Sequence, residues 1–353
     1  MNSLQFLSLL GTIIAGVAYL VWRLRALDDR LHNNLKPELE RELKRLRLDL
    51  WEIAAGLMQG QSRERAEPGV FHHPIFSLFP PFKGPAEPGF DVDFLGVRTR
   101  RDRAGDMRIP AAAAGMYPSV SEEYFEWIDL LEAVAAANGP FTMVELGAGN
   151  GPWLVRAGVA LRRLERKEFK LVGVEAEPVH FRWMGEHFLD NGLRPDQHWL
   201  IEAMVSTKEG KGHFFVGRSA DWYGQRALTN DEIAAIPQQT GEKRLYGDTV
   251  SEVASVTLNS ILEKAGRVDL LDADIQGAEL EVLEAAKDKL NAQVKRIHIG
   301  THNAEVEAGL RRVFSALGWE KINDFACGSV SLTKWGLVRF GDGVQTWINP
   351  HLD

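Results

Sequence analysis

The sequence predicts an α/β domain with a mostly parallel sheet and helices on both faces, and three segments lead to this prediction. Residues 141–164 contain an apolar strand, a glycine-rich turn and a helical pattern. Residues 170–191 repeat the order of strand and helix, and residues 268–285 repeat it again. Strands that alternate with helices favour a parallel sheet. A helix is expected over residues 121–137, and the domain should span residues 115–353.

Composition excludes several classes of protein. The chain has 353 residues, of which 45% are hydrophobic and 25% are charged, as in an ordinary globular protein. The net charge of −8 argues against binding to nucleic acid, because phosphate neutralisation needs a basic surface. We therefore expect no nucleic-acid partner. A single cysteine, Cys327, excludes an intramolecular disulfide and a zinc site made of several thiolates.

The first 22 residues have the character of a transmembrane anchor. Residues 1–22 contain no charged side chain, and residues 4–22 are almost wholly apolar. About 20 such residues in a helix cross the hydrocarbon core of a bilayer. A signal peptide would carry basic residues before its apolar stretch, and none precedes this one. An interfacial or core helix is the third alternative.

The arginines behind the anchor predict its orientation. Arg23, Arg25 and Arg30 follow the apolar segment directly, and basic flanking residues stay on the cytoplasmic side of a membrane. We expect a single-pass protein of the inner (plasma) membrane with its catalytic domain in the cytoplasm.

Two segments should connect the anchor to the domain. In residues 23–58, leucines recur in steps of three and four, which predicts a helix with one apolar stripe. The stripe at residues 24–57 favours either a homodimeric coiled coil or an amphipathic helix that lies on the membrane or on the domain. Residues 59–114 are rich in proline and glycine and predict a linker with some docked pieces. Four arginines of this linker are expected to be solvated or to face lipid: Arg98, Arg100, Arg101 and Arg103.

The turn after strand 141–146 has the composition of a cofactor-binding loop. It places an acidic residue and three glycines at alternate positions: Glu145, Gly147, Gly149 and Gly151. Glycine lets the backbone turn sharply and approach a ligand at the start of the next helix. A dinucleotide-binding loop would need glycine at position 152, where this chain has Pro152. The carboxylate of Glu145 suits a cofactor with a cationic amino-acid end.

The next two strands should contribute further cofactor contacts. Strand 170–174 ends at Glu175, at the position where an acidic side chain holds the hydroxyls of a ribose. A strand over residues 198–205 should place Glu202 and Ala203 beside an adenine ring. Acidic or small residues at successive strand ends are more specific than any one of these features.

With these motifs the sequence resembles the class I methyltransferases, and within them the FkbM family. The resemblance rests on VELGAGNG, VGVEAEP and VDLLDADIQGAELEVLEA, and it covers roughly residues 115–345. It implies a seven-stranded sheet, S-adenosylmethionine as cofactor, and an acceptor hydroxyl on a glycan, glycolipid or similar molecule. One departure is Gln276, at a position where many relatives have glutamate.

The expected function is methylation of a glycan or lipid-linked hydroxyl at the cytoplasmic membrane face. The alternative from another class is an inactive membrane-tethered scaffold that keeps the fold. A nicotinamide-dependent oxidoreductase is disfavoured by Pro152.

Catalytic residues should follow the fourth and fifth strands, where the carboxyl ends of parallel strands form the active site. Asp274 ends the fourth strand and His302 follows the fifth. Transfer of a methyl group to a hydroxyl requires removal of a proton, so His302 is the expected general base and Asp274 the residue that orients it. His298 is the alternate base, although it has the position of a core histidine. We expect no metal; the alternative is Mg²⁺ bound by Asp274, Glu279 and a histidine.

Two further predictions concern the rest of the domain. Residues 214–249 interrupt the pattern of the sheet and should form an insertion over the acceptor site or one that only packs on the domain. Residues 330–340 and 344–348 flank an Asp-Gly turn and predict the closing antiparallel hairpin.

Overall fold

The computed structural model describes residues 72–85, 87–103, 116–216, 225–228, 230–235, 244–245 and 248–352. The predicted anchor (1–22) and the leucine-rich segment (23–58) lie outside these residues. Among the described residues, no helix combines the length and the hydrophobicity needed to cross a bilayer.

The domain consists of a central sheet, covering helices and three smaller sheets. The central sheet is made of seven strands: β3 (Phe141–Leu146), β4 (Phe169–Glu175), β5 (Trp199–Glu202), β10 (Leu270–Ala273), β11 (Arg296–Thr301), β12 (Glu320–Phe325) and β15 (Gly343–Ile348). The α-helices are α3 (Glu123–Ala136), α4 (Pro152–Arg163), α5 (Pro178–Asp190), α6 (Asn230–Ala235), α7 (Leu258–Ala265), α8 (Glu279–Ala285), α9 (Lys287–Gln293) and α10 (Ala304–Ala316). The smaller strands are β1 (Phe90–Val92), β2 (Arg98–Arg100), β6 (Met204–Ser206), β7 (Gly210–Val216), β8 (Arg244–Leu245), β9 (Asp248–Thr257), β13 (Ser329–Thr333) and β14 (Gly336–Phe340). The short helices are η1 (Pro74–Leu78), η2 (Arg101–Arg103) and η4 (Pro195–Gln197).

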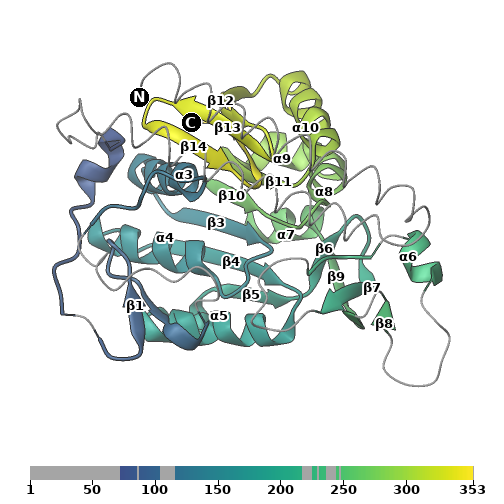
Figure 1. The fold of residues 1–353 in the computed structure, drawn as a ribbon, viewed down its shortest axis with the longest axis horizontal. Coiled ribbons are helices and arrows are strands. Elements are labelled where there is room, and N and C mark those ends of the chain that lie inside the picture. Colours follow the sequence, from purple (N-terminus) through teal and green to yellow (C-terminus); the bar gives the residue numbers. More distant parts are fainter. Residues whose placement is uncertain are drawn as a thin grey trace, which may run out of the picture. The chain divides into compact units, whose positions relative to one another are not determined.

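The central sheet has the predicted seven strands and is mostly parallel. Its order is β12-β15-β11-β10-β3-β4-β5, and Figure 1 shows β10, β3, β4 and β5 side by side. β15 runs antiparallel to both of its neighbours, and the other pairings of this sheet are parallel. The strand order reverses between β3 and β10, which is the topological switch point at which open α/β sheets bind ligands.

Helices cover both faces of the sheet, as predicted. Alternate residues of a strand point to opposite faces, so Met143 and Val144 of β3 belong to two different apolar clusters. The first cluster also contains buried residues of α3, α4 and α5. The second contains buried residues of α7, α8, α9 and α10. Burial of both faces of the sheet explains why its strands are apolar runs with little alternation.

The predicted strand over residues 198–205 is in fact two strands in two sheets. β5 ends at Glu202, and the backbone N–H of Ala203 donates to the carbonyl of Glu175, 2.9 Å away. After this break, β6 pairs with β9 in a four-stranded sheet that also contains β7 and β8. The predicted insertion over residues 214–249 therefore contributes to a second sheet, and its residues 217–224, 229, 236–243 and 246–247 lie outside the described residues.

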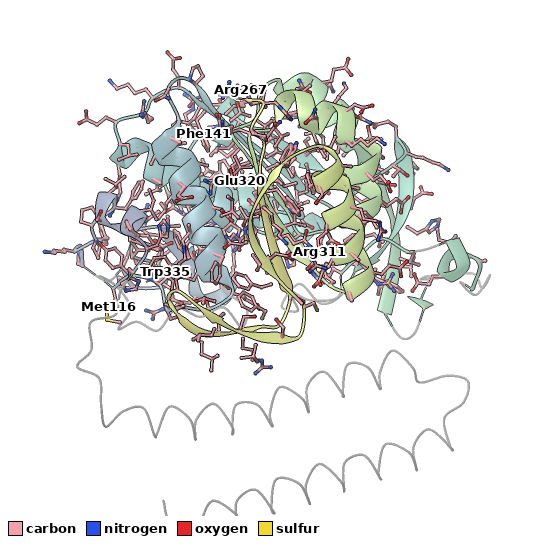
Figure 2. The ribbon with its side chains drawn as sticks, turned by 90° about the horizontal axis from the view of Figure 1, so that it is seen from above. Met116, Phe141, Arg267, Arg311, Glu320 and Trp335 are labelled. Atoms are coloured by element: carbon pink, nitrogen blue, oxygen red, sulfur yellow. The ribbon has the colours of Figure 1, made fainter. Side chains whose placement is uncertain are left out.

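The prediction of the closing hairpin was wrong. Strands β13 and β14 pair with each other, whereas β15 pairs with β11 and β12 in the central sheet. Figure 2 shows Trp335 at the turn of the β13–β14 hairpin. The Asp-Gly step at residues 342–343 begins a central strand, because Gln345, Thr346 and Trp347 are buried there.

Residues 72–103 pack on the domain. Phe76 and Phe94 are buried in the same cluster as the residues of α3. The ring of Phe76 stacks on Tyr124 of α3 with a centroid distance of 5.2 Å. Part of the predicted linker over residues 59–114 is therefore one of its docked pieces.

The arginines of this segment face carboxylates of the protein. Arg100 lies 2.6 Å from Asp190 and 3.0 Å from Glu186, both on α5. Arg103 also pairs with Glu186, and Arg98 pairs with Glu87 at 2.7 Å. Arg101 pairs with Asp91 at 2.9 Å. The expectation that the four arginines are solvated or face lipid is corrected by these ion pairs.

Candidate functional site

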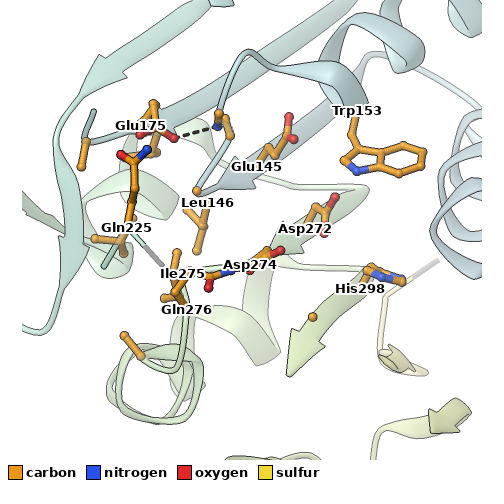
Figure 3. A pocket seen from close by; sticks show the side chains of 18 of the residues that line it. Glu145, Leu146, Trp153, Glu175, Gln225, Asp272, Asp274, Ile275, Gln276 and His298 are labelled. Atoms are coloured by element: carbon orange, nitrogen blue, oxygen red, sulfur yellow. Dashed lines mark hydrogen bonds between the residues drawn. The ribbon is translucent and has the colours of Figure 1, made fainter. Parts of the chain in front are cut away.

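A cavity lies at the carboxyl ends of β3, β4 and β10, and Figure 3 shows it from close by. Glu175 and Gln225 lie at one end, and Asp272 and His298 lie at the other. Six of the predicted site residues line it: Glu145, Gly147, Gly149, Glu175, Ala203 and Asp274. Gly151, Glu202 and His302 are outside the lining.

The glycine turn connects β3 to the start of α4, and two of its glycines have positive φ angles that close contacts require. The N–H groups of Gly147 and Ala148 both donate to the carbonyl of Val174 at 3.0 Å. Gly147 has φ +77°, and a Cβ there would lie 1.9 Å from the carbonyl oxygen of Asp274. Gly151 has φ +67° and caps α4, where a Cβ would meet Met184 at 2.8 Å. Glycine at 147 therefore allows two strand-end loops to approach each other, whereas glycine at 151 serves the packing of α4.

Glu175 is fixed by the backbone around it. Its carboxylate accepts the N–H of Gly149 at 2.7 Å and the N–H of Glu177 at 2.6 Å. Each carboxylate oxygen can accept a second hydrogen bond, so a ligand in the cavity can still be bound. Burial raises the pKa of Glu175.

Glu202 lies at the matching position of the next strand but has a different environment. It is paired in register with Glu175 and its side chain is exposed. Ala203, the following residue, is buried and lines the cavity. Of the two residues that we expect beside an adenine, only Ala203 therefore lies at the cavity.

Arg156 forms a cationic part of the cavity wall. Its guanidinium lies over the rings of Trp153 and Trp127 at 4.2 and 4.4 Å. Its Nε lies 3.2 Å from the buried carboxylate of Asp93, which follows β1. A residue of the N-terminal docked segment thus holds a side chain of the cavity in place.

A row of polar side chains crosses one face of the sheet. Glu145, Asp272, His298 and Thr346 occupy paired positions on β3, β10, β11 and β15. All four are buried, and three of them are titratable. Burial, and next the charge of Asp272, raise the pKa of Glu145 well above its usual value. Polar residues in a row on the apolar face of a sheet favour a ligand-binding role over a packing role.

His298 is the alternate base of the sequence analysis, and it lines the cavity. Its Nδ1 lies 2.7 Å from Oδ2 of Asp129 on α3. The same carboxylate accepts a hydrogen bond from Thr346 at 2.5 Å and one from Arg296 at 2.8 Å. Burial lowers the pKa of His298, but the hydrogen bond to Asp129 and the charge of Asp272 outweigh it, so the pKa is raised. A residue expected to be part of the core is therefore at the site.

Glu126 of α3 completes this end of the cavity. It lines the cavity, and one of its carboxylate oxygens lies within 4.8 Å of one of Asp272. Burial, and next the charge of Asp272, raise the pKa of Glu126 well above its usual value. Two carboxyl groups in contact cannot both be charged at low cost unless a cation lies between them.

His302 is held by two carboxylates beside the cavity. Its Nε2 lies 3.3 Å from Asp274, and its Nδ1 lies 3.1 Å from the buried Glu279. Burial lowers the pKa of His302, but the hydrogen bonds to Asp274 and Glu279 outweigh it and raise the pKa to about 11. An imidazolium has no lone pair to take a proton, which weighs against the predicted role of His302 as general base.

Gln276 and Glu279 support the loop that carries Asp274. The carboxylate of Glu279 accepts the N–H groups of Ile275 and Gly277, both at 3.0 Å. The amide of Gln276 lies 3.0 Å from Asp274 and 2.9 Å from Nε2 of His302. The amide nitrogen of Gln276 donates the bond to Asp274, and Nε2 of His302 faces the same carboxylate, so both side chains hold Asp274.

Several residues of the site were missed in the sequence. Glu126 and Arg156 lie on helices, where a charged residue normally indicates a solvated face, and Trp153 has the position of a core residue. Asp272, in contrast, is expected from the sequence as a structural or cofactor-side residue, because it lies two residues before Asp274 and thus on the same side of the strand. No local pattern connects Asp129 with His298.

The fold and the site define the class of protein. A parallel sheet in this order, a glycine turn after its first strand and an acidic residue after its second form a class I methyltransferase domain. Residues 145–320 match the family described as the Methyltransferase FkbM domain. The chain thus carries a methyltransferase domain of the FkbM family.

Individual proteins are similar to this chain to different degrees. A protein of Jannaschia sp. (strain CCS1) named "Putative methyltransferase" is 28% identical over 240 residues, which are 66% of this chain and 83% of that protein. The crystal structure of methyltransferase FkbM from Methylobacillus flagellatus KT aligns at 11% identity with a TM-score of 0.36, over 59% of this chain and 43% of that one. Precorrin-6y C5,15-methyltransferase from Geobacter metallireducens GS-15 aligns at 8% identity with a TM-score of 0.37, over 65% and 89% of the two chains.

Proposed function

We propose that this chain binds S-adenosylmethionine in the cavity and methylates a hydroxyl group of a glycan, glycolipid or similar acceptor. The observation that carries the proposal is that Gly147 and Glu175 line the same cavity of a methyltransferase domain. The glycine turn leaves space that a Cβ at residue 147 would fill, and the carboxylate of Glu175 is held in place beside it.

The charges of the cavity fit this cofactor. When bound, S-adenosylmethionine supplies a methyl group activated by a sulfonium cation. Glu145 and Glu175 are carboxylates that can bind the amino group and the ribose hydroxyls, and Ala203 leaves room for a flat ring. The guanidinium of Arg156 is placed to bind a carboxylate, such as the one at the amino-acid end of the cofactor.

Replacement of Glu175 by alanine tests the cofactor assignment. Glu175→Ala should weaken the binding of S-adenosylmethionine by about 1–3 kcal/mol, because ribose hydroxyls would lose their acceptor. This loss corresponds to a rise in Kd of roughly 5- to 150-fold. Calorimetric titration of the full-length chain with the cofactor and with its demethylated product measures it.

Glu202→Ala is the matched control for this measurement. Glu202 is paired with Glu175 on the neighbouring strand, but it is exposed and lies outside the cavity lining. Its replacement should leave Kd unchanged. Equal affinities of the parent and Glu175→Ala would mean that the ribose is held elsewhere, and a parent that does not bind the cofactor would favour the inactive scaffold.

The acceptor hydroxyl should bind near Asp274. This carboxylate lines the cavity and its side chain is 53% exposed, so it can be reached by an acceptor. A Cβ at Gly300 on the next strand would lie 3.4 Å from the carboxyl carbon of Asp274. Because residue 300 is glycine, no side chain stands there between this carboxylate and an acceptor. In the proposed reaction Asp274 accepts the hydrogen bond of the acceptor hydroxyl. His302 and Gln276 hold that carboxylate in position. Asp274 thus takes the role of base that we expected for His302, and His302 takes the orienting role that we expected for Asp274.

The membrane location is part of the proposal and is supported by the sequence of residues 1–22. We propose a single-pass anchor in the inner (plasma) membrane with the catalytic domain in the cytoplasm, and a homodimeric contact through residues 24–57. Deletion of residues 1–22 should move most of the protein from the membrane to the soluble fraction, because the apolar segment is lost. Ultracentrifugation and immunoblotting measure the distribution.

A reporter fused to the C-terminus is the control for orientation. A reporter that works in the cytoplasm should be active, and one that works only after export should be inactive, because Arg23 and Arg25 follow the anchor. An active exported reporter would contradict the orientation. Retention of the shortened chain on membranes would place the membrane contact in residues 24–57.

A further inference from the structure

The end of the cavity opposite Glu175 gathers three metal-binding side chains. They come from a helix and two neighbouring strands: Glu126 of α3, Asp272 of β10 and His298 of β11. One potential ligand atom from each lies within 4.8 Å of the others. Ligands of one small divalent cation are roughly 3 to 4 Å apart at bond lengths near 2.1 Å, so small side-chain adjustments bring the three atoms into a coordination sphere.

His298 is oriented as a metal ligand. Its Nδ1 is engaged by Asp129, which is fully buried and also bonded to Arg296 and Thr346. The other ring nitrogen, Nε2, is left for the side that faces the cavity. Metal-binding histidines usually have this arrangement, in which a carboxylate holds one nitrogen and thereby fixes the ring and its tautomer.

Asp272 supplies an independent observation. Its side chain is 4% exposed and lines the cavity, yet its Oδ1 has no hydrogen-bond partner. A buried carboxylate oxygen without a partner is costly, because its interaction with water is lost and nothing replaces it. Glu126, with a ligand atom within 4.8 Å, carries a second carboxyl group and so adds to this cost. A cation between the two groups would remove both penalties.

We propose that Glu126, Asp272 and His298 bind a divalent cation at the end of the cavity opposite Glu175. This differs from the absence of a metal that we expect from the sequence, and from the alternative set of Asp274, Glu279 and a histidine. In that alternative set, the two ring nitrogens of His302 lie 3.3 and 3.1 Å from the carboxylates of Asp274 and Glu279, so a cation would have to replace these ion pairs. In the set at Asp272, only Nδ1 of His298 is engaged, by Asp129, and Oδ1 of Asp272 has no hydrogen-bond partner.

The ligand set indicates the class of cation. Two carboxylates suit Mg²⁺ and Mn²⁺, and an imidazole nitrogen favours transition metals such as Mn²⁺, Fe²⁺ and Zn²⁺. One imidazole with two carboxylates therefore favours a divalent transition metal, and Mn²⁺ is the probe of choice. The cation would bind and orient the oxygen of the acceptor in the proposed reaction. That role rests on the proposed function, whereas binding of the cation does not.

Binding of Mn²⁺ to the full-length chain tests the proposal. The protein is treated with a chelator, exchanged into metal-free buffer and titrated with MnCl₂, while electron paramagnetic resonance measures free Mn²⁺. We expect one strongly bound ion per chain. Glu126→Gln, Asp272→Asn and His298→Ala should each raise Kd about tenfold or more, the scale on which loss of ligand support weakens metal sites.

Two controls and one second measurement make the result specific. Glu284→Gln removes a charge from an exposed residue of α8 outside the cavity lining and should leave Kd unchanged. Glu279→Gln alters the other cluster and should also leave it unchanged. Mn²⁺ should raise the melting temperature of the parent but not that of Glu126→Gln, which keeps the shape of the side chain and loses a carboxylate ligand.

Three outcomes would overturn the proposal. They are a parent that binds neither Mn²⁺ nor Zn²⁺, unchanged affinity in all three ligand variants, and a loss of affinity in Glu279→Gln alone. Because metal binding is measured without an acceptor and without turnover, failure here leaves the proposed methyl transfer intact. Failure of the Glu175→Ala test likewise leaves the metal proposal intact.

Discussion

Gly147→Ala is expected to abolish the binding of S-adenosylmethionine at concentrations at which the parent is saturated. The added Cβ would lie 1.9 Å from the carbonyl oxygen of Asp274, which is backbone and cannot rotate away. Residue 147 also has φ +77°, a conformation that costs an L-residue about 1–2 kcal/mol. Together with the strain of overpacking, about 1–3 kcal/mol, the loss should be on the order of 100-fold in affinity or more.

Gly185→Ala is the matched control for this variant. Gly185 lies within α5, and a Cβ there would meet no atom within 4 Å. Alanine is favoured over glycine inside a helix, so this variant should bind the cofactor as the parent does and be no less stable. Calorimetry measures binding, and circular dichroism on heating measures stability. Parent-like binding by a folded Gly147→Ala protein would mean that the cofactor does not approach this turn.

Asp274→Asn is expected to lower turnover by about 10²- to 10⁴-fold, the range typical of a group that takes part in proton removal. An amide of the same shape cannot accept the proton of a hydroxyl, and it loses the ion pair with His302. Affinity for the cofactor should change little, because the carboxylate lies outside the glycine turn. Turnover is measured as transfer of label from methyl-labelled S-adenosylmethionine to lipid and polysaccharide extracts of cells that lack the protein.

His302→Ala separates a positioning role from a catalytic one. If His302 only holds Asp274, this variant should lose less turnover than Asp274→Asn. The exposed control Glu284→Gln should retain the parent's turnover. A larger loss in His302→Ala than in Asp274→Asn would restore His302 as the base. Mass spectrometry of the labelled product identifies the acceptor in the same experiment.

The local elements of the fold could be predicted because they depend on short-range patterns. The helix over residues 121–137, the strand over residues 141–146 and the glycine turn follow from periodicity and from the conformations that glycine allows. The structure has these elements with boundaries shifted by no more than two residues. The carboxylates at the ends of the first two strands could be predicted for the same reason, since the position of a residue at a strand end is a local property.

The long-range pairings could not be predicted from the sequence. The Asp-Gly step at residue 342 suggests a hairpin turn, but the partners of β15 are chosen by burial of Trp347 and Gln345 inside the sheet. The contact of Asp129 with His298 joins residues 169 positions apart. His298 lies inside a strand and therefore has the sequence position of a core residue. Its place at the cavity becomes evident only from its contact with Asp129.

The place of β15 also affects how the protein is made. β15 comes last of the seven strands in the chain, but it hydrogen-bonds to both β11 and β12. During synthesis the other six strands emerge first, and β12 cannot join the sheet until residues 343–348 are available. Gly343 and Val344 at the start of β15 also line the cavity. A nascent chain thus has no complete cavity until its last strand has left the ribosome, so a cofactor bound there as we propose can stabilise only a fully synthesised domain.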